Sequence, residues 1–226
     1  MLRIAVLCGL LFINGWAKAE NEPYNRADFQ VDAAREVAND LLIAVMSADI
    51  QDKQPARIAQ QLNATVNDAL KKSAAFKTIK LSSGNQNTYP VYGKNNQIDA
   101  WRGHAEIRLE SRNFKDAGEL IMQLQQNMQL GNVQFALAPD TRTQIENALI
   151  TEAIKAFQMR ADAIRAAFGA TSYKVVRLSI SGAGIPPYRP NMAMRAALSE
   201  SAIPAPEFAA GDSRISVQIN GTIEMQ

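Results

Sequence analysis

His104, the chain's single histidine, is the first residue whose chemistry could serve a reaction. A histidine can act as a general base near neutral pH, but neither a cysteine nor an evident carboxylate pair lies close to His104 in the sequence. A zinc site needs three or four nitrogen, sulfur or oxygen ligands, and one histidine without cysteines does not supply them. Asp28 with Asp32, and Asp49 with Asp52, lack the pattern of a calcium-binding loop. We therefore expect no catalytic residue, no metal site and no cofactor.

A glycine-rich segment follows an expected strand, as the phosphate-binding loop of a dinucleotide site would. It reads Gly182-Ala183-Gly184, but prolines stand at positions 186 and 187, where a third glycine and the start of a helix belong. A turn out of the sheet is the better interpretation. The chain also lacks the Gly-x-Ser-x-Gly motif of a serine hydrolase. Two alternatives stay open: an enzyme, hydrolase-like or other, with a cryptic carboxylate or histidine site, and a carrier of a small ligand.

Tyr89, Tyr92, Trp101 and Arg102 form the densest aromatic cluster after the first nineteen residues. Tyrosine, tryptophan and arginine are the residues that most often anchor protein–protein interfaces. The same rings could instead cover one end of a hydrophobic core, and the sequence favours that interpretation over a binding patch. We take these four as the candidate partner-binding residues.

The elements that would position these residues follow from the spacing of apolar side chains. Alternating segments predict strands at 29–33, 41–48, 76–81, 89–92, 98–110, 133–138, 173–181 and 215–225. Apolar residues three or four apart predict helices at 55–70, 113–131 and 141–169, the last with a capping box, Thr141-x-x-Gln144. We expect the first two strands to form a hairpin and 82–87 to be a polar turn. The predicted fold class is α+β, with mainly antiparallel sheet packed against two or three amphipathic helices.

The first nineteen residues have the three parts of a secretory signal peptide. Arg3 supplies the positive start, 4–13 is apolar, and Ala17-Lys18-Ala19 fits the small-x-small cleavage rule. The apolar run of about ten residues is roughly half the length that spans a bilayer, so an export signal is expected here and not an anchor. A lipoprotein signal is disfavoured because a bulky leucine precedes Cys8. We expect cleavage after Ala19, a periplasmic or secreted protein, and a single domain over 20–226.

Charge and cysteine content narrow the possible partners. Of the 24 basic residues, Arg3 and Lys18 lie in the expected signal peptide, so the remaining chain carries as many basic as acidic side chains. This balance gives no reason to expect nucleic acid as a partner. The chain's one cysteine, Cys8, would leave with the signal, so the exported domain is expected to have no disulfide.

Several short motifs, in order along the chain, together resemble the SIMPL domain family of bacterial exported proteins, which has some eukaryotic relatives. They are residues 37–40 (VAND), 89–92 (YPVY), 98–103 (IDAWRG), 118–121 (GELI), 133–135 (VQF), 153–169, 192–194 (MAM) and Gly211 before the last strand. The resemblance implies an α+β domain of the periplasm or envelope. Members are linked to oxidative stress defence or to ring-like self-assembly, and the family supplies no agreed active site.

From the resemblance and the residues together, we expect a non-enzymatic assembly or binding protein that contributes to envelope or oxidative stress defence. Its expected partner is a second copy of itself or another envelope protein. No transmembrane segment is expected after the signal peptide.

Overall fold

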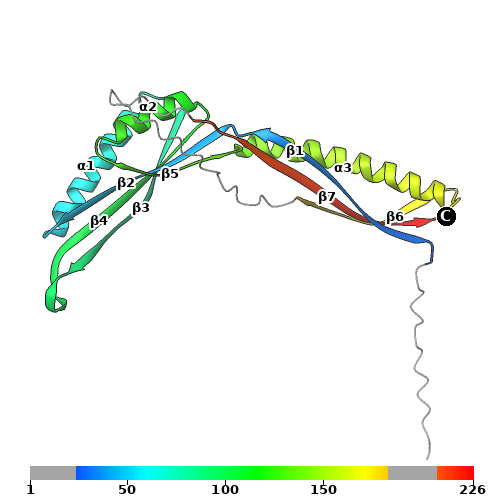
Figure 1. The fold of residues 1–226 in the computed structure, drawn as a ribbon, viewed down its shortest axis with the longest axis horizontal. Helices are drawn as coiled ribbons and strands as arrows, with labels where there is room; N and C mark the ends of the chain where they lie inside the picture. Colours follow the sequence, from blue (N-terminus) through cyan, green and yellow to red (C-terminus); the bar gives the residue numbers. More distant parts are fainter. Residues whose placement is uncertain (1–23, 183–207) are drawn as a thin grey trace, which may run out of the picture.

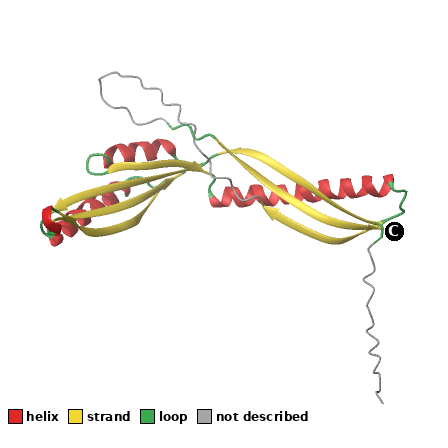
Figure 2. Ribbon diagram, turned by 60° about the horizontal axis from the view of Figure 1, so that its bottom comes forward, coloured by secondary structure: helices red, strands yellow, loops and turns green. Residues whose placement is uncertain are grey.

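The computed structural model describes residues 24–182 and 208–226, which form two antiparallel sheets with helices packed on them (Figures 1 and 2). The strands are β1 (Arg26–Ala38), β2 (Leu41–Asp52), β3 (Ile79–Tyr92), β4 (Ile98–Ser111), β5 (Gln129–Ala136), β6 (Tyr173–Gly182) and β7 (Asp212–Met225). The helices are α1 (Pro55–Ser73), α2 (Phe114–Leu124), α3 (Pro139–Ala167) and the short 3-10 turn η1 (Lys94–Asn96). The α+β prediction is confirmed. The expected signal peptide and the prolines at 186 and 187 lie outside the described residues.

The sheet of order β1-β7-β6 is covered by the long helix α3. One stripe of α3 is buried, and its Phe157 ring stacks on Phe29 of β1 with centroids 4.6 Å apart. Every second residue of β7, from Ile215 to Ile223, points into this core, apart from Gly221, which faces the Phe157 ring. Alternation along β7 and helical periodicity along α3 therefore produce one apolar layer between sheet and helix.

The sheet of order β3-β4-β2-β5 carries α1 and α2 on one face. The predicted alternation of β4 is confirmed, because Ile107 and Leu109 are buried under the helices while Glu106 and Arg108 are half-buried on the opposite face. That opposite face is polar, and it is called the open face below.

The predicted hairpin of the first two strands is wrong. β1 pairs with β7, whereas β2 lies between β4 and β5 in the other sheet. The chain passes from β1 into β2 without reversing (Figure 1). Asn39 and Asp40, which have the composition of a turn, instead link two sheets, because the dense apolar content of β2 suits a central strand with neighbours on both sides.

Two other boundaries differ from the prediction. The expected polar turn at 82–87 lies within β3, where the register shifts between Ser83 and Gln86 as in a β-bulge. Helix α2 ends at Leu124, well before Gly131, and the backbone N–H groups of Asn127 and Met128 close a turn onto the Leu124 carbonyl. Met128 is buried, so it fits the helical spacing while lying in that turn.

Candidate functional site

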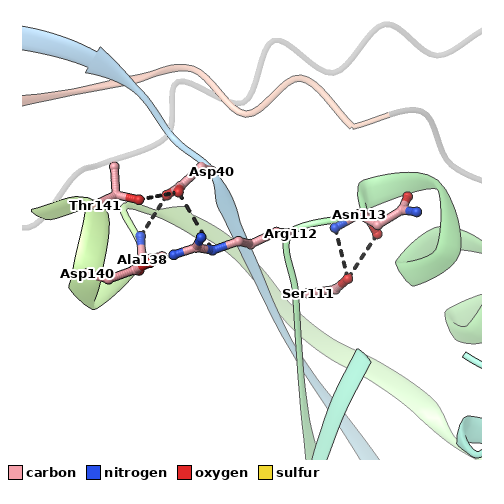
Figure 3. Close-up of polar contacts among 7 residues, drawn as sticks. All are labelled: Asp40, Ser111, Arg112, Asn113, Ala138, Asp140 and Thr141. Carbon is pink, nitrogen blue, oxygen red and sulfur yellow. Dashed lines mark hydrogen bonds and ion pairs between the residues drawn. The ribbon is translucent and has the colours of Figure 1, made fainter. Parts of the chain in front are cut away.

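The link between the two sheets is the most extensively bonded polar site of the described chain. The Asp40 carboxylate accepts a hydrogen bond from the backbone N–H of Ala138 at 2.7 Å and another from the Thr141 hydroxyl at 2.6 Å (Figure 3). Ala138 is the N-cap of α3 and its own side chain cannot cap the helix. The predicted capping box is therefore wrong: Thr141 lies in the first turn, and a carboxylate about a hundred positions earlier satisfies this helix end.

Arg112 extends this network from the end of β4. Its Nε lies 3.8 Å from an oxygen of Asp40, and its Nη2 pairs with Asp140 in the first turn of α3 (Figure 3). Burial alone would raise the pKa of Asp40, but hydrogen bonds from Thr141 and Ala138, together with the Arg112 charge, lower it below its ordinary value. The carboxylate is therefore held in its ionised form.

Asn39 makes the matching contacts on the other side of the link. Its backbone N–H donates to the Gly211 carbonyl at 3.0 Å, and its side-chain amide donates to the Ala210 carbonyl at 2.9 Å. The Ser213 hydroxyl donates to the Asn39 Oδ1 at 2.6 Å. Asn39 is buried, so these bonds account for its polar groups without water.

Close to Arg112, Asn113 starts α2 as the sequence predicts, and Ser111 bonds to it (Figure 3). Asn113 Oδ1 accepts from the backbone N–H of Asp116 at 3.2 Å, which confirms Asn113 as N-cap. The buried Ser111 hydroxyl donates to the Thr78 carbonyl at 3.0 Å and accepts from the Asn113 N–H at 3.0 Å. The polar groups of this site bind one another, so its geometry suits a structural joint between the sheets.

His104 lies on the open face, between two carboxylates. Its Nδ1 is 3.1 Å from Asp49 Oδ1 on β2, and its Nε2 is 3.1 Å from Glu106 Oε1 on β4. These bonds to Glu106 and Asp49 raise the pKa of His104 above its ordinary value. Neither carboxylate was predicted from the sequence as a partner of His104, although Glu106 follows two positions later and must share a face with His104 on a strand.

The cluster around His104 does not have the form of a metal site. Among the residues that the structure describes, no group of three or more His, Cys, Asp and Glu side chains could hold a metal ion. A histidine whose two nitrogens both face carboxylates is stabilised as the cation, which is a poor general base at neutral pH.

The four candidate partner-binding residues do not form one patch. Tyr89 and Arg102 are cross-strand partners on the open face, where Arg102 donates to the Gln51 side chain at 3.1 Å. Tyr92 is exposed near the end of the β3–β4 hairpin. Trp101 points the other way and packs against the core beneath α1. The structure thus brings two of the four together and separates Trp101 from them by the thickness of the sheet.

A shallow hollow of about 500 Å³ lies on the face of the β1-β7-β6 sheet opposite α3. The residues that line it are Asp28, Phe29, Gln30, Arg177, Ser179, Asn220, Gly221 and Thr222. The Asp28 carboxylate accepts a hydrogen bond from Thr222, so one charged group of the hollow is already bonded. This surface is polar and broadly open.

Strand β6 carries the most exposed apolar surface on any described strand. Val175, Val176, Leu178 and Ile180 are between 43% and 46% exposed, although they lie in a ten-residue strand. In the described part of the chain, β6 pairs with β7 and with no further strand. The alternation of apolar residues predicts this strand, but it carries no signal for the strand's position at the edge of a sheet.

Comparison with known proteins assigns a family and no activity. The family model described as SIMPL, a protein of unknown function (DUF541), matches residues 29–223. A comparison with curated proteins found no match. Within the residues described, no helix has the length and apolar character needed to cross a membrane.

Proposed function

The chain belongs to the SIMPL family, and we propose that it is an exported, non-enzymatic protein of the cell envelope. It works by assembling with itself or by binding an envelope protein. Through that binding it contributes to defence against oxidative or envelope stress. The observation that carries the assembly part is β6, an edge strand with four exposed apolar side chains. Unprotected edges of this kind are templates for pairing with another chain.

Export is supported by the pattern of the first nineteen residues, from Arg3 to Ala17-Lys18-Ala19. The test is the intact mass of protein recovered from the periplasmic fraction of a bacterial host. The proposal requires a mature chain that begins at Glu20. A mass that still includes Cys8, or an acyl group on it, contradicts cleavage after Ala19.

A binding role is supported over catalysis by how the polar clusters are used. Asp40 and Asn39 are occupied by bonds to the chain itself, and His104 is held between Asp49 and Glu106. Groups bonded in this way are not arranged around a place for a reacting molecule.

The assembly role is tested by sedimentation velocity on the chain from Glu20 onward over a hundredfold range of protein concentration. A sedimentation coefficient that rises with concentration supports self-association, whereas a monomer at every concentration contradicts it. A parallel test measures peroxide survival of a host strain lacking the gene and carrying either the wild-type chain or His104→Ala. Equal protection supports a non-catalytic role, and loss of protection by a folded His104→Ala protein favours the enzyme hypothesis.

A further inference from the structure

We propose that β6 of one copy pairs antiparallel with β6 of a second copy about a two-fold axis, which joins two three-stranded sheets into one continuous sheet. This inference rests on the proposed assembly function and names the surface and the occupant. It follows from how differently the two edges of the β1-β7-β6 sheet are protected.

The β1 edge is guarded by α3. Arg160 of α3 donates to the backbone carbonyl of Gln30 at 3.1 Å, and Glu152 of α3 pairs with Arg35 of β1. The same strand carries regularly spaced acidic side chains, a device that discourages pairing with another strand. An incoming strand at β1 would therefore have to displace helix side chains.

In the described residues no helix side chain bonds to the β6 edge, and the basic side chains and register shift of β6 lie in its first half, at Lys174 to Arg177. No side chain there donates to the backbone of β6, and α3 packs mainly on β1 and β7. An extended strand with free backbone groups and apolar side chains exposes a surface that a second strand would both bond and bury.

The apolar side chains that face α3 are buried on β7 but remain partly exposed on β6. Ile180 is the cross-strand partner of Ile219, which is completely buried, yet Ile180 itself is 44% exposed. Leu178, opposite Gly221, lies on the same side of the sheet and is 43% exposed. A further strand beyond β6 would continue this layer and bury part of the exposed surface of both side chains against its own apolar side chains.

Side-chain charge is compatible with a β6–β6 pair. With the two-fold axis at Leu178, each Leu178 faces the other and Arg177 faces Ser179 of the second copy, so no like charges are directly opposite. Shifting the axis to Ser179 places Arg177 opposite Ser181, with the same result. Both registers keep apolar side chains on the α3 side of the joined sheet.

A β6–β6 pair is also favoured because it forms a closed dimer with no further β6 edge left open. β1 and β6 both run antiparallel to β7, so they are parallel to each other. A copy added to β6 through β1 with its helix on the same side would therefore pair in parallel and leave another β6 edge open. A two-fold β6–β6 pair is antiparallel, and it pairs both exposed β6 edges so that neither remains open.

Disulfide trapping tests the pairing directly, because Cys8 is the chain's only cysteine. In a Cys8→Ser background, single cysteines are placed at Leu178, Ser179 or Ile180, and the purified proteins are oxidised and separated without reductant. A two-fold antiparallel pair predicts a covalent dimer from at least one of these variants alone. The control Met159→Cys, an exposed position on α3, is expected to stay monomeric.

Two results would overturn the inference while sparing the proposed function. One is a dimer that forms only when Leu178→Cys is mixed with Asp32→Cys, which would mean that β6 pairs with β1. The other is wild-type self-association with no trapping at any β6 position. A wild-type chain that stays monomeric at every concentration contradicts both the β6–β6 pair and the self-assembly part of the proposed function.

A second measurement uses the double variant Leu178→Lys with Ile180→Lys. Because both side chains are already half-exposed, the fold should survive, which circular dichroism checks. The dissociation constant for self-association should rise at least tenfold, whereas Met159→Lys should leave it unchanged. Unaltered association of the folded double variant would overturn the β6–β6 pair.

Discussion

Asn39 and Asp40 are neighbours in the chain, yet their side chains bind different segments: Asn39 holds the residues that enter β7, and Asp40 holds the start of α3. The peptide that joins the two sheets is thus fixed from both sides. Arg112, which follows β4, pairs at the same place with Asp40 of the link and with Asp140 of α3 (Figure 3). The buried apolar side chains form two separate clusters, one for each sheet, and these hydrogen bonds connect the two parts.

The first prediction concerns this joint. Asp40→Ala should lower the free energy of unfolding by about 1–3 kcal/mol, because it leaves the Ala138 N–H and Thr141 hydroxyl without their acceptor. Asp140→Ala, which removes an exposed partner of Arg112 and the acidic side chain in the first turn of α3, should change it by about 1 kcal/mol or less. Urea denaturation of both variants at pH 7 provides the measurement.

The difference in stability between wild type and Asp40→Ala should also depend on pH. The folded pKa of Asp40 is lowered, so its contribution is present above its unfolded pKa, about 3.9, and disappears as pH falls through the folded pKa. The stability gap between wild type and Asp40→Ala should therefore narrow below about pH 4. A gap that widens there would mean that the carboxylate is not held in its ionised form.

His104 should show the opposite dependence. Its folded pKa is raised, so its stabilisation is full below its unfolded pKa of about 6.5 and is lost as pH rises through the folded value. His104→Asn should destabilise the fold more at pH 5.5 than at pH 8.5. Thermal unfolding at the two pH values checks this, and an equal loss at both would contradict the cation between carboxylates.

Two glycines are required by close packing of a helix on a sheet. A Cβ at Gly221 would lie 2.4 Å from the Phe157 ring, and one at Gly103 would lie 2.1 Å from Ile58. Each change to alanine should cost about 1–3 kcal/mol of stability. Gly131→Ala is the matched control, because its nearest neighbour would be 3.4 Å away. Chemical denaturation of the three variants should separate the first two from the third.

Variants of Trp101 and Tyr92 test whether residues of the predicted aromatic cluster stabilise the core or bind a partner. Trp101→Ala should lower stability by about 2–3 kcal/mol, less than for a fully buried tryptophan, because the ring packs partly against the core. Tyr92→Ala, at a 57% exposed position, should stay within about 0.5 kcal/mol of wild type. A Trp101→Ala protein of wild-type stability that no longer self-associates would instead favour the binding role.

Local sequence patterns determined the elements that depend on local contacts. The alternation in β4, the stripe of α3 and the Asn113 cap all follow from side chains within one strand or one helical turn, and each is present as expected. The sequence placed Tyr89 and Arg102 in one cluster with Tyr92 and Trp101, but their cross-strand pairing follows only from the register of β3 on β4.

Tertiary structure decided the features that join distant segments. Whether β1 turns back on β2 or continues into another sheet depends on β7, nearly two hundred residues later, which competes for β1 with a complete register. Thr141 resembles a cap, but Asp40 takes the role because a carboxylate placed by a second sheet is a better acceptor for that helix end. The exposure of Ile180 has the same cause: an alternating strand shows which side chains share a face, and only the packing of α3 shows which of them it covers.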